Sequence, residues 1–257
     1  MILTAAAAFL LSASPMAQDA TRAGALTTAE PAKVATLDDL KGEPSRLAWS
    51  PDGSEFYVQT LEGGFGNPKA KLRHYIISAT DGKKRDAGTE PEWALDYWKS
   101  KSDRVSPDDP AFRIELKSES RREQTTAVPR GGDLARGGTT VESSIGRNDA
   151  VDAAFNSQIA FLNTMLLKGQ AIGVFDNTVI VPGLTFGWGP KGSGIIAFSH
   201  PGTGRIVTMD ATGTTKEVAG SKEAVLPAWS PDGSRLAWLQ KDGKKKVVLQ
   251  VARVSRS

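Results

Sequence analysis

The seven residues AWSPDGS occur twice in this chain, at 48–54 and again at 228–234. In each copy a tryptophan, Trp49 or Trp229, ends an apolar stretch, and Ser-Pro-Asp-Gly follows it. Proline fixes φ, aspartate can hydrogen-bond to its own backbone and glycine accepts a positive φ, so this tetrapeptide is typical of a tight turn. The residues after the turns, EFYVQT and RLAWLQ, are rich in β-forming side chains. Each copy therefore predicts a β-hairpin with a buried tryptophan beside its turn.

A third copy of the motif, GWGPKGSGIIAFSH, occupies residues 187–200. It keeps the tryptophan, the proline and the glycine but has Lys191 in place of the aspartate. A strand at 205–209, a turn and a short strand at 215–218 are expected to follow it. The residues that we assign to the structural repeat are Trp49, Pro51, Asp52, Gly53, Trp188, Pro190, Gly192, Trp229, Pro231, Asp232 and Gly233.

The spacing of the tryptophans indicates a period in the low forties. Trp229 follows Trp188 by 41 residues, and Trp93, in EPEWALDYW, follows Trp49 by 44. Four short strands per repeat of this length are typical of a β-propeller blade. We expect five blades, centred near residues 49, 93, 145–165, 188 and 229. Six blades are the alternative, if residues 98–145 hold a further unit.

The sequence WSPDG, followed by an apolar strand and then by a second strand such as RIVTMDATG, resembles the TolB-like, WD-type β-propeller repeat of bacterial envelope proteins. The motif matches strongly at 48–60 and 228–240, well at 187–218, and covers about half of the expected mature chain. The resemblance implies an all-β propeller of four-stranded antiparallel blades. It also implies a periplasmic interaction protein, although such blades serve binding proteins and peptidase accessory domains alike.

In propellers related to TolB, an N-terminal strand commonly completes the last blade and covers its open edge. The last repeat of this chain has three predicted strands, ending with 245–254, and lacks a fourth. The strand-like piece AKVATLDDL, at 32–40, belongs to no repeat. We therefore predict that residues 33–38 pair with 246–253, which would close the ring and make the first and last blades neighbours.

The N-terminus is typical of a secretory signal peptide, assigned to residues 1–17. Residues 2–13, ILTAAAAFLLSA, are almost wholly apolar but too short for a stable membrane-spanning helix. Residues 18–32 are small and polar and predict a flexible lead-in, and 33–257 predict a single propeller domain. We expect a periplasmic or secreted protein with no integral membrane span after cleavage. An uncleaved membrane anchor is the alternative.

The composition limits the chemistry that the chain can perform. It contains no cysteine, which excludes thiolate catalysis, and its two histidines, His74 and His200, lie far apart in the sequence. The P-loop motif and the motifs of zinc proteases and serine hydrolases are absent from the sequence. A net charge of +3 is too small to indicate a nucleic-acid partner. We expect no cofactor and no metal; a two-histidine metal site across blades is the alternative.

The densest group of aromatic and acidic residues lies in EPEWALDYW, at 90–98. Paired carboxylates beside aromatic rings suit a sugar-binding or glycosidase site, and tryptophan and tyrosine equally suit a protein-binding surface. A third interpretation is a degenerate blade in which Trp93 replaces the motif tryptophan. The candidate binding residues are Glu90, Glu92, Trp93, Asp96, Tyr97 and Trp98, and no catalytic residue is assigned.

Three other segments carry structural expectations. Residues 112–128, FRIELKSESRREQTTAV, alternate well enough to predict a β-hairpin, and TMLLKGQAIGVF, at 164–175, predicts a hairpin that turns at Lys168-Gly169. The one helical candidate is 149–162, whose second half also has a strand pattern.

These observations favour a non-enzymatic binding module for a protein, a peptide or another component of the cell envelope. The alternative is a small glycosidase-like hydrolase that uses carboxylates at the central channel. That alternative requires at least two acids on facing inner strands, whereas Glu92 and Asp96 come from one segment.

Overall fold

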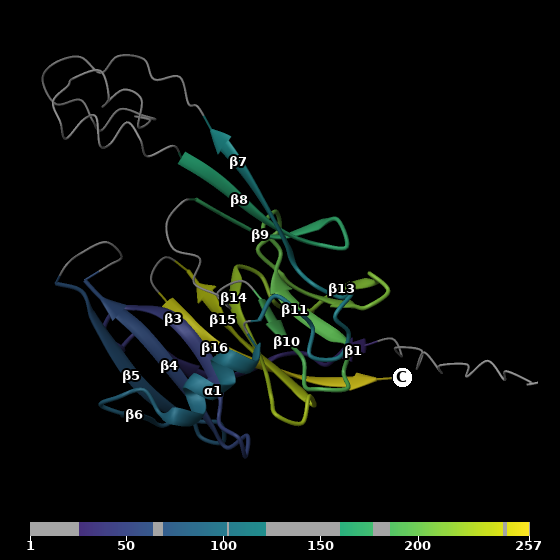
Figure 1. Cartoon of the computed structure of the whole chain (residues 1–257). Helices are drawn as coiled ribbons and strands as arrows, with labels where there is room; N and C mark the ends of the chain where they lie inside the picture. The colour runs from purple at the N-terminus through teal and green to yellow at the C-terminus, as the bar shows by residue number, and fades with distance from the viewer. Residues whose placement is uncertain are drawn as a thin grey trace, which may run out of the picture.

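The computed structural model describes residues 26–63, 69–101, 103–121, 160–176, 186–243 and 246–256. These residues form four antiparallel β-sheets and one helix (Figure 1). The predicted signal peptide lies outside the described residues, as does most of the helical candidate at 149–162.

The first sheet begins with the first heptad and is a four-stranded meander in the order β3-β4-β5-β6. Its strands are β3 (Glu43–Trp49), β4 (Glu55–Glu62), β5 (Lys71–Ser78) and β6 (Lys84–Asp86). Trp49 lies opposite Phe56 across the turn and is 1% exposed. The predicted hairpin with a buried tryptophan is therefore confirmed.

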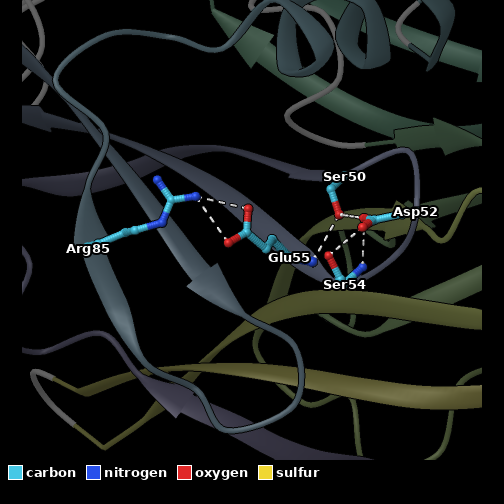
Figure 2. Close-up of polar contacts among 5 residues, drawn as sticks. All are labelled: Ser50, Asp52, Ser54, Glu55 and Arg85. Carbon is cyan, nitrogen blue, oxygen red and sulfur yellow. Dashed lines mark hydrogen bonds and ion pairs between the residues drawn. The ribbon is translucent and has the colours of Figure 1, made fainter.

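The Ser-Pro-Asp-Gly turn is held together by its own side chains (Figure 2). Asp52 accepts hydrogen bonds from the hydroxyls of Ser50 and Ser54, at 2.6 and 2.7 Å, and from the Ser54 N–H at 3.0 Å. These donors lower the pKa of Asp52 to about 2, because they favour its charged form. The second copy repeats the same bonds around Asp232. The heptad thus encodes a turn stabilised by local contacts, and a distant residue, Arg235, adds a hydrogen bond from its guanidinium to the Gly53 carbonyl, at 3.0 Å.

Two further sheets contain the third and second copies of the motif. The third copy forms β10 (Phe186–Trp188), β11 (Ile195–Ser199), β12 (Ile206–Asp210) and β13 (Thr215–Glu217). The second copy forms β14 (Ala224–Trp229) and β15 (Arg235–Asp242), and β16 (Lys246–Arg256) follows. The strands expected from the sequence in both regions are confirmed.

The N-terminal part of the described chain completes the last sheet. β2 (Ala32–Thr36) pairs antiparallel with β16, as predicted for 33–38 and 246–253. β1 (Leu26–Thr28) pairs with the far end of the same strand. The flexible lead-in expected over 18–32 is therefore wrong from β1 onwards, because this part of the backbone is bound in the ladder.

The remaining sheet has the order β7-β8-β9. Its strands are β7 (Glu115–Arg121), β8 (Ala160–Leu167) and β9 (Gln170–Asp176). The hairpin of β8 and β9 turns at Lys168-Gly169, which confirms that prediction. β7 supplies the first half of the hairpin expected within 112–128 and pairs with β8, while the second half of that hairpin lies outside the described residues.

A fourth, degenerate copy of the turn precedes β7, in VSPDDPAF at 105–112. The Ser106 N–H bonds to the carbonyl of Phe112 across the turn, as the corresponding serine does in the first copy. Val105 forms a β-bridge with Arg113. Val105 thus occupies the position that Trp49 has in the first copy, where Trp49 pairs with Phe56. Because valine replaces tryptophan and the turn is one residue longer, a search for WSPDG misses this unit.

The segment predicted to be a blade near Trp93 is instead a helix, α1 (Glu92–Lys101), which corrects that prediction. Pro91 precedes the helix, an acidic residue lies in its first turn and two lysines lie in its last, as the helix dipole favours. Ala94 and Trp98, one turn apart, form its buried face. In this segment the helical spacing of the apolar residues indicates the structure correctly, and the distance between the tryptophans does not.

Candidate functional site

The motif tryptophans join neighbouring sheets at the end where the heptad turns lie, which we call the turn end. The Trp49 indole Nε1–H donates a hydrogen bond to the carbonyl of Ala228, at 2.9 Å. The Trp229 Nε1–H donates in the same way to the carbonyl of Gly187, at 3.1 Å. Each acceptor is the residue just before the tryptophan of the next sheet. The first and last sheets are therefore neighbours, as predicted.

The degenerate turn continues this series into the β7-β8-β9 sheet. The Trp188 Nε1–H donates to the carbonyl of Asp103, just ahead of the fourth turn. The third copy of the motif lacks an aspartate, and Asp108 of the fourth turn supplies one. Its carboxylate accepts hydrogen bonds from the Gly192 and Gly194 N–H groups, at 2.5 and 2.7 Å. A residue of one sheet thus completes the turn of another.

Replacing Asp108 with alanine should lower the free energy of unfolding by about 1–3 kcal/mol, because two backbone amides lose a charged acceptor. Asp108→Asn keeps one neutral acceptor and should cost less. The measurement is urea denaturation followed by tryptophan fluorescence. Glu92→Gln, a change at an exposed position of α1, is the control and should cost only the small contribution of a charge at the helix N-terminus, about 0.3–1 kcal/mol. A cost below about 0.5 kcal/mol for alanine would contradict the role of this carboxylate.

The helix α1 lies against the turn ends of the sheets (Figure 1). Its Ala94 is fully buried against the first sheet. The Tyr97 hydroxyl donates to the carbonyl of Trp229 in the last sheet, at 2.9 Å. The Lys101 Nζ donates to the carbonyl of Gly189, at 2.9 Å, and burial lowers the pKa of this amine to about 8. The helix therefore connects the turn ends of three sheets.

Four of the six candidate binding residues take part in this packing. Besides Tyr97, Glu90 forms an ion pair with Arg46 of β3, at 3.0 Å. The guanidinium carbon of Arg46 lies 5.1 Å from the ring centre of Trp98, which is 7% exposed. Trp93 meets a buried tyrosine of β4 edge-on. The structure thus gives these four residues a role in holding α1, and their predicted role in binding stays a prediction.

The other two candidates, Glu92 and Asp96, are exposed on α1. Asp96 forms an ion pair with Lys99, at 3.8 Å. Because both acids belong to one helix, this pair does not provide the facing carboxylates that a glycosidase requires. Within the described residues there is no cluster of three or more histidine, aspartate and glutamate side chains that could hold a metal ion. None of the helices in the described part of the chain could span a membrane.

A cavity of about 490 Å³ lies between the first and last sheets at the other end of their strands, which we call the cavity end. β3 begins at Glu43, beside the cavity, and ends at Trp49, at the turn end. β14 likewise begins beside the cavity and ends at its motif tryptophan. Cavities of this volume are typical of ligand sites. The cavity end thus lies away from α1.

The backbone of β14 is strained beside the cavity. Glu223 and Leu226 have φ values of 52° and 57°, in the left-handed region that costs a non-glycine residue about 1–2 kcal/mol. The pairing register with β15 shifts between Val225 and Ala228. As a result Leu226 is buried, whereas Val225 lines the cavity and is 46% exposed. Strained non-glycine residues are found preferentially at functional sites.

Sequence reasoning did not identify this cavity. Its wall combines the segment 37–44, which links the N-terminal strand to the first sheet, with the β15–β16 hairpin of the last sheet. The pairing of β2 with β16, which the sequence does predict, is the only signal that could have placed these segments together.

The similarity of this chain to known proteins is distant. No protein-family model matches the chain, and no curated protein is similar to it. Among solved structures, the putative TolB from Agrobacterium tumefaciens matches with 12% identity over 84% of this chain and 63% of that chain, with a TM-score of 0.25. An oligogalacturonate lyase in complex with manganese matches with 10% identity over 84% and 67%, also with a TM-score of 0.25. The chain thus spans less than two thirds of the TolB structure that it matches.

Proposed function

We propose that this chain is a non-enzymatic binding module of the cell envelope, periplasmic or secreted, that captures a protein or peptide at the cavity end of its sheets. The observation that carries this proposal is the cavity between the first and last sheets, with exposed Val225 on a strained strand. The signal-peptide pattern of residues 1–17 supports the proposed location.

In this proposal the four sheets are consecutive blades of a TolB-like propeller, and β2 is the closing strand of the last blade. Three indole-to-carbonyl hydrogen bonds, made by Trp49, Trp229 and Trp188, link the sheets one after another. Ala94 of α1 packs on the face of the first sheet formed by Ala48 and Ile76. The helix thus takes the place beside the first blade that a further blade would take.

Capture of a partner from an envelope extract of the host tests the proposal. The chain from residue 18 onwards is crosslinked to the extract, and captured proteins are identified by mass spectrometry. Val225→Asp places a charge in the cavity and should reduce recovery of the specific partner at least about tenfold, because the carboxylate must lose water to enter an apolar site. Leu95→Asp is the matched control, since Leu95 is exposed on α1, and it should leave capture unchanged.

The two variants show whether the partner binds at the cavity or on the exposed face of α1. Loss of capture in Leu95→Asp but not in Val225→Asp would move the site to α1 and restore the six residues predicted from the sequence. Equal capture by both variants and by the unmodified chain would contradict binding at either surface.

A further inference from the structure

One edge of β7 lies where the other sheets have an inner strand. In the first sheet the strand before the turn, β3, pairs with β4 along its whole length, from Glu43 to Trp49. In the fourth unit only residues 103–105 lie beside the strand that follows the turn, because the chain before them forms α1. From Glu115 to Arg121, β7 therefore has a neighbouring strand on one side only, within the described part of the chain. We call the other side the free edge of β7.

The hydrogen bonds of the fourth turn show which backbone groups point towards this side. The Ser106 N–H donates to the carbonyl of Phe112, at 3.0 Å. The Ile114 N–H donates to the carbonyl of Arg104, at 2.7 Å. Both bonds join the strand after the turn to the short piece that stands in the inner position. The backbone groups of even-numbered residues thus point inwards at the start of this strand.

The same alternation continues into β7. Ile114 is buried in one core cluster with Met165, and Met165 is the register partner of Leu116. Residues 114 and 116 therefore lie on one face of the sheet, as the two-residue period of a strand requires. It follows that the N–H and C=O groups of Leu116, Ser118 and Ser120 point to the free edge.

The free edge lacks the features that commonly protect an exposed strand. The pairing of β7 with β8 runs from Glu115 to Arg121 without a shift in register, so no bulge twists the edge away. The strand contains no proline. Figure 1 shows β7 and β8 projecting away from the other sheets, with no other helix or strand beside the outer part of β7. A regular edge of this kind pairs readily with a strand of another chain.

The sequence of β7, ELKSESR, is complementary in charge to a second copy of itself in antiparallel orientation. Pairing centred on Ser118 puts the residues whose backbone groups point to the edge in hydrogen-bonded positions. The same register sets Glu115 opposite Arg121 of the second copy, and Lys117 opposite Glu119. Opposite charges at facing positions stabilise an antiparallel pair, whereas a parallel arrangement in register would bring like charges together. The charge pattern therefore favours a second copy of this chain as the partner.

We infer that two copies of this chain form a dimer by pairing their β7 strands antiparallel about Ser118. The twofold axis passes through this position, and the two β7-β8-β9 sheets become one continuous sheet. The β7-β8-β9 sheet does not line the cavity, so the inference goes beyond the proposed function and either can fail without the other. One pair of edge strands makes a small interface, which predicts a weak dimer that depends on concentration.

Sedimentation velocity of the chain from residue 18 onwards tests the inference. We expect monomers to give way to dimers as the protein concentration rises from about 1 to 200 µM, the range of a weak interface. Ser118→Pro should stay monomeric throughout, because proline removes the N–H at the centre of the dimer. This N–H points away from β8, so the variant keeps the ladder within its own sheet. Its thermal midpoint, measured by circular dichroism, should match that of the unmodified chain.

Two charge reversals test the register. Glu115→Arg and Arg121→Glu each place like charges opposite each other in a dimer of identical chains, and each should weaken that dimer about tenfold or more. An equal mixture of the two variants restores opposite charges at these positions, so it should form a dimer that contains one chain of each. The controls are Glu92→Arg and Lys191→Glu, which make the same changes in charge at exposed positions outside β7. These controls should dimerise as the unmodified chain does, alone or mixed.

The outcomes separate this dimer from other arrangements. A chain that stays monomeric at every concentration overturns the inference. A dimer that persists in Ser118→Pro and in both charge variants uses another surface and also overturns it. If the proline variant fails to fold, the mixing experiment decides alone: a mixture no more dimeric than its two components would contradict pairing about Ser118.

Discussion

Replacing Trp229 with alanine should lower the free energy of unfolding by about 3–5 kcal/mol, which is the cost of removing a large aromatic side chain from a core. Trp229 is 2% exposed and packs with apolar residues of its own sheet and of the neighbouring β11. Its indole also donates to Gly187, so the substitution removes a link between two sheets. Urea denaturation gives the value, and an unchanged dependence on urea concentration would show that the denatured state is not altered.

Two further variants separate packing from hydrogen bonding at this position. Trp229→Phe keeps much of the apolar volume but removes the indole N–H, and it should cost less than alanine while still leaving the Gly187 carbonyl without this donor. Trp93→Ala removes a tryptophan that is only partly buried and should cost less again. Stability of Trp229→Ala within about 1 kcal/mol of the unmodified chain would contradict the role of this residue as an anchor between sheets.

The two heptad turns could be predicted from the sequence because the contacts of their aspartates are local. Asp52 bonds to serines two residues away on either side, so the heptad alone contains the information. The pairing of β2 with β16 could also be predicted, because the last repeat lacks a strand and an unassigned strand pattern was available. The antiparallel β-sheets of the fold followed from these observations and from the strand patterns between the turns.

The helix and the cavity could not be predicted in the same way. Trp93 lies at the spacing expected of a blade, and that coincidence concealed the pair Ala94 and Trp98, whose spacing of four indicates a helix. The cavity depends on a left-handed Leu226 and a shift in register, and leucine gives no signal for positive φ in a sequence. Neither feature has a local signal in the sequence, so both become visible only in three dimensions.

A chain that begins at residue 41 should unfold at a temperature about 10 °C or more below that of a chain that begins at residue 18. The shorter chain loses β2, together with Ala35 and Leu37, which are buried in the core shared by the first and last sheets. Removing a buried leucine alone costs about 2–5 kcal/mol, and each kcal/mol shifts the midpoint of a domain of this size by about 2–4 °C. The deletion also exposes the edge of β16. Thermal unfolding followed by circular dichroism measures the difference.

Adding the missing strand as a separate peptide shows whether the shortened chain is less stable because it lacks this strand or simply because it is shorter. A synthetic peptide of residues 26–40 should raise the midpoint of the shortened chain, because it can restore the ladder with β16 and refill the position of Leu37. A scrambled peptide of the same composition should not. A chain that begins at residue 26 keeps both N-terminal strands and should match the longer chain. An unchanged midpoint for the chain from residue 41 would mean that the last sheet is stable with β16 at its edge, and the closing role of β2 would be lost.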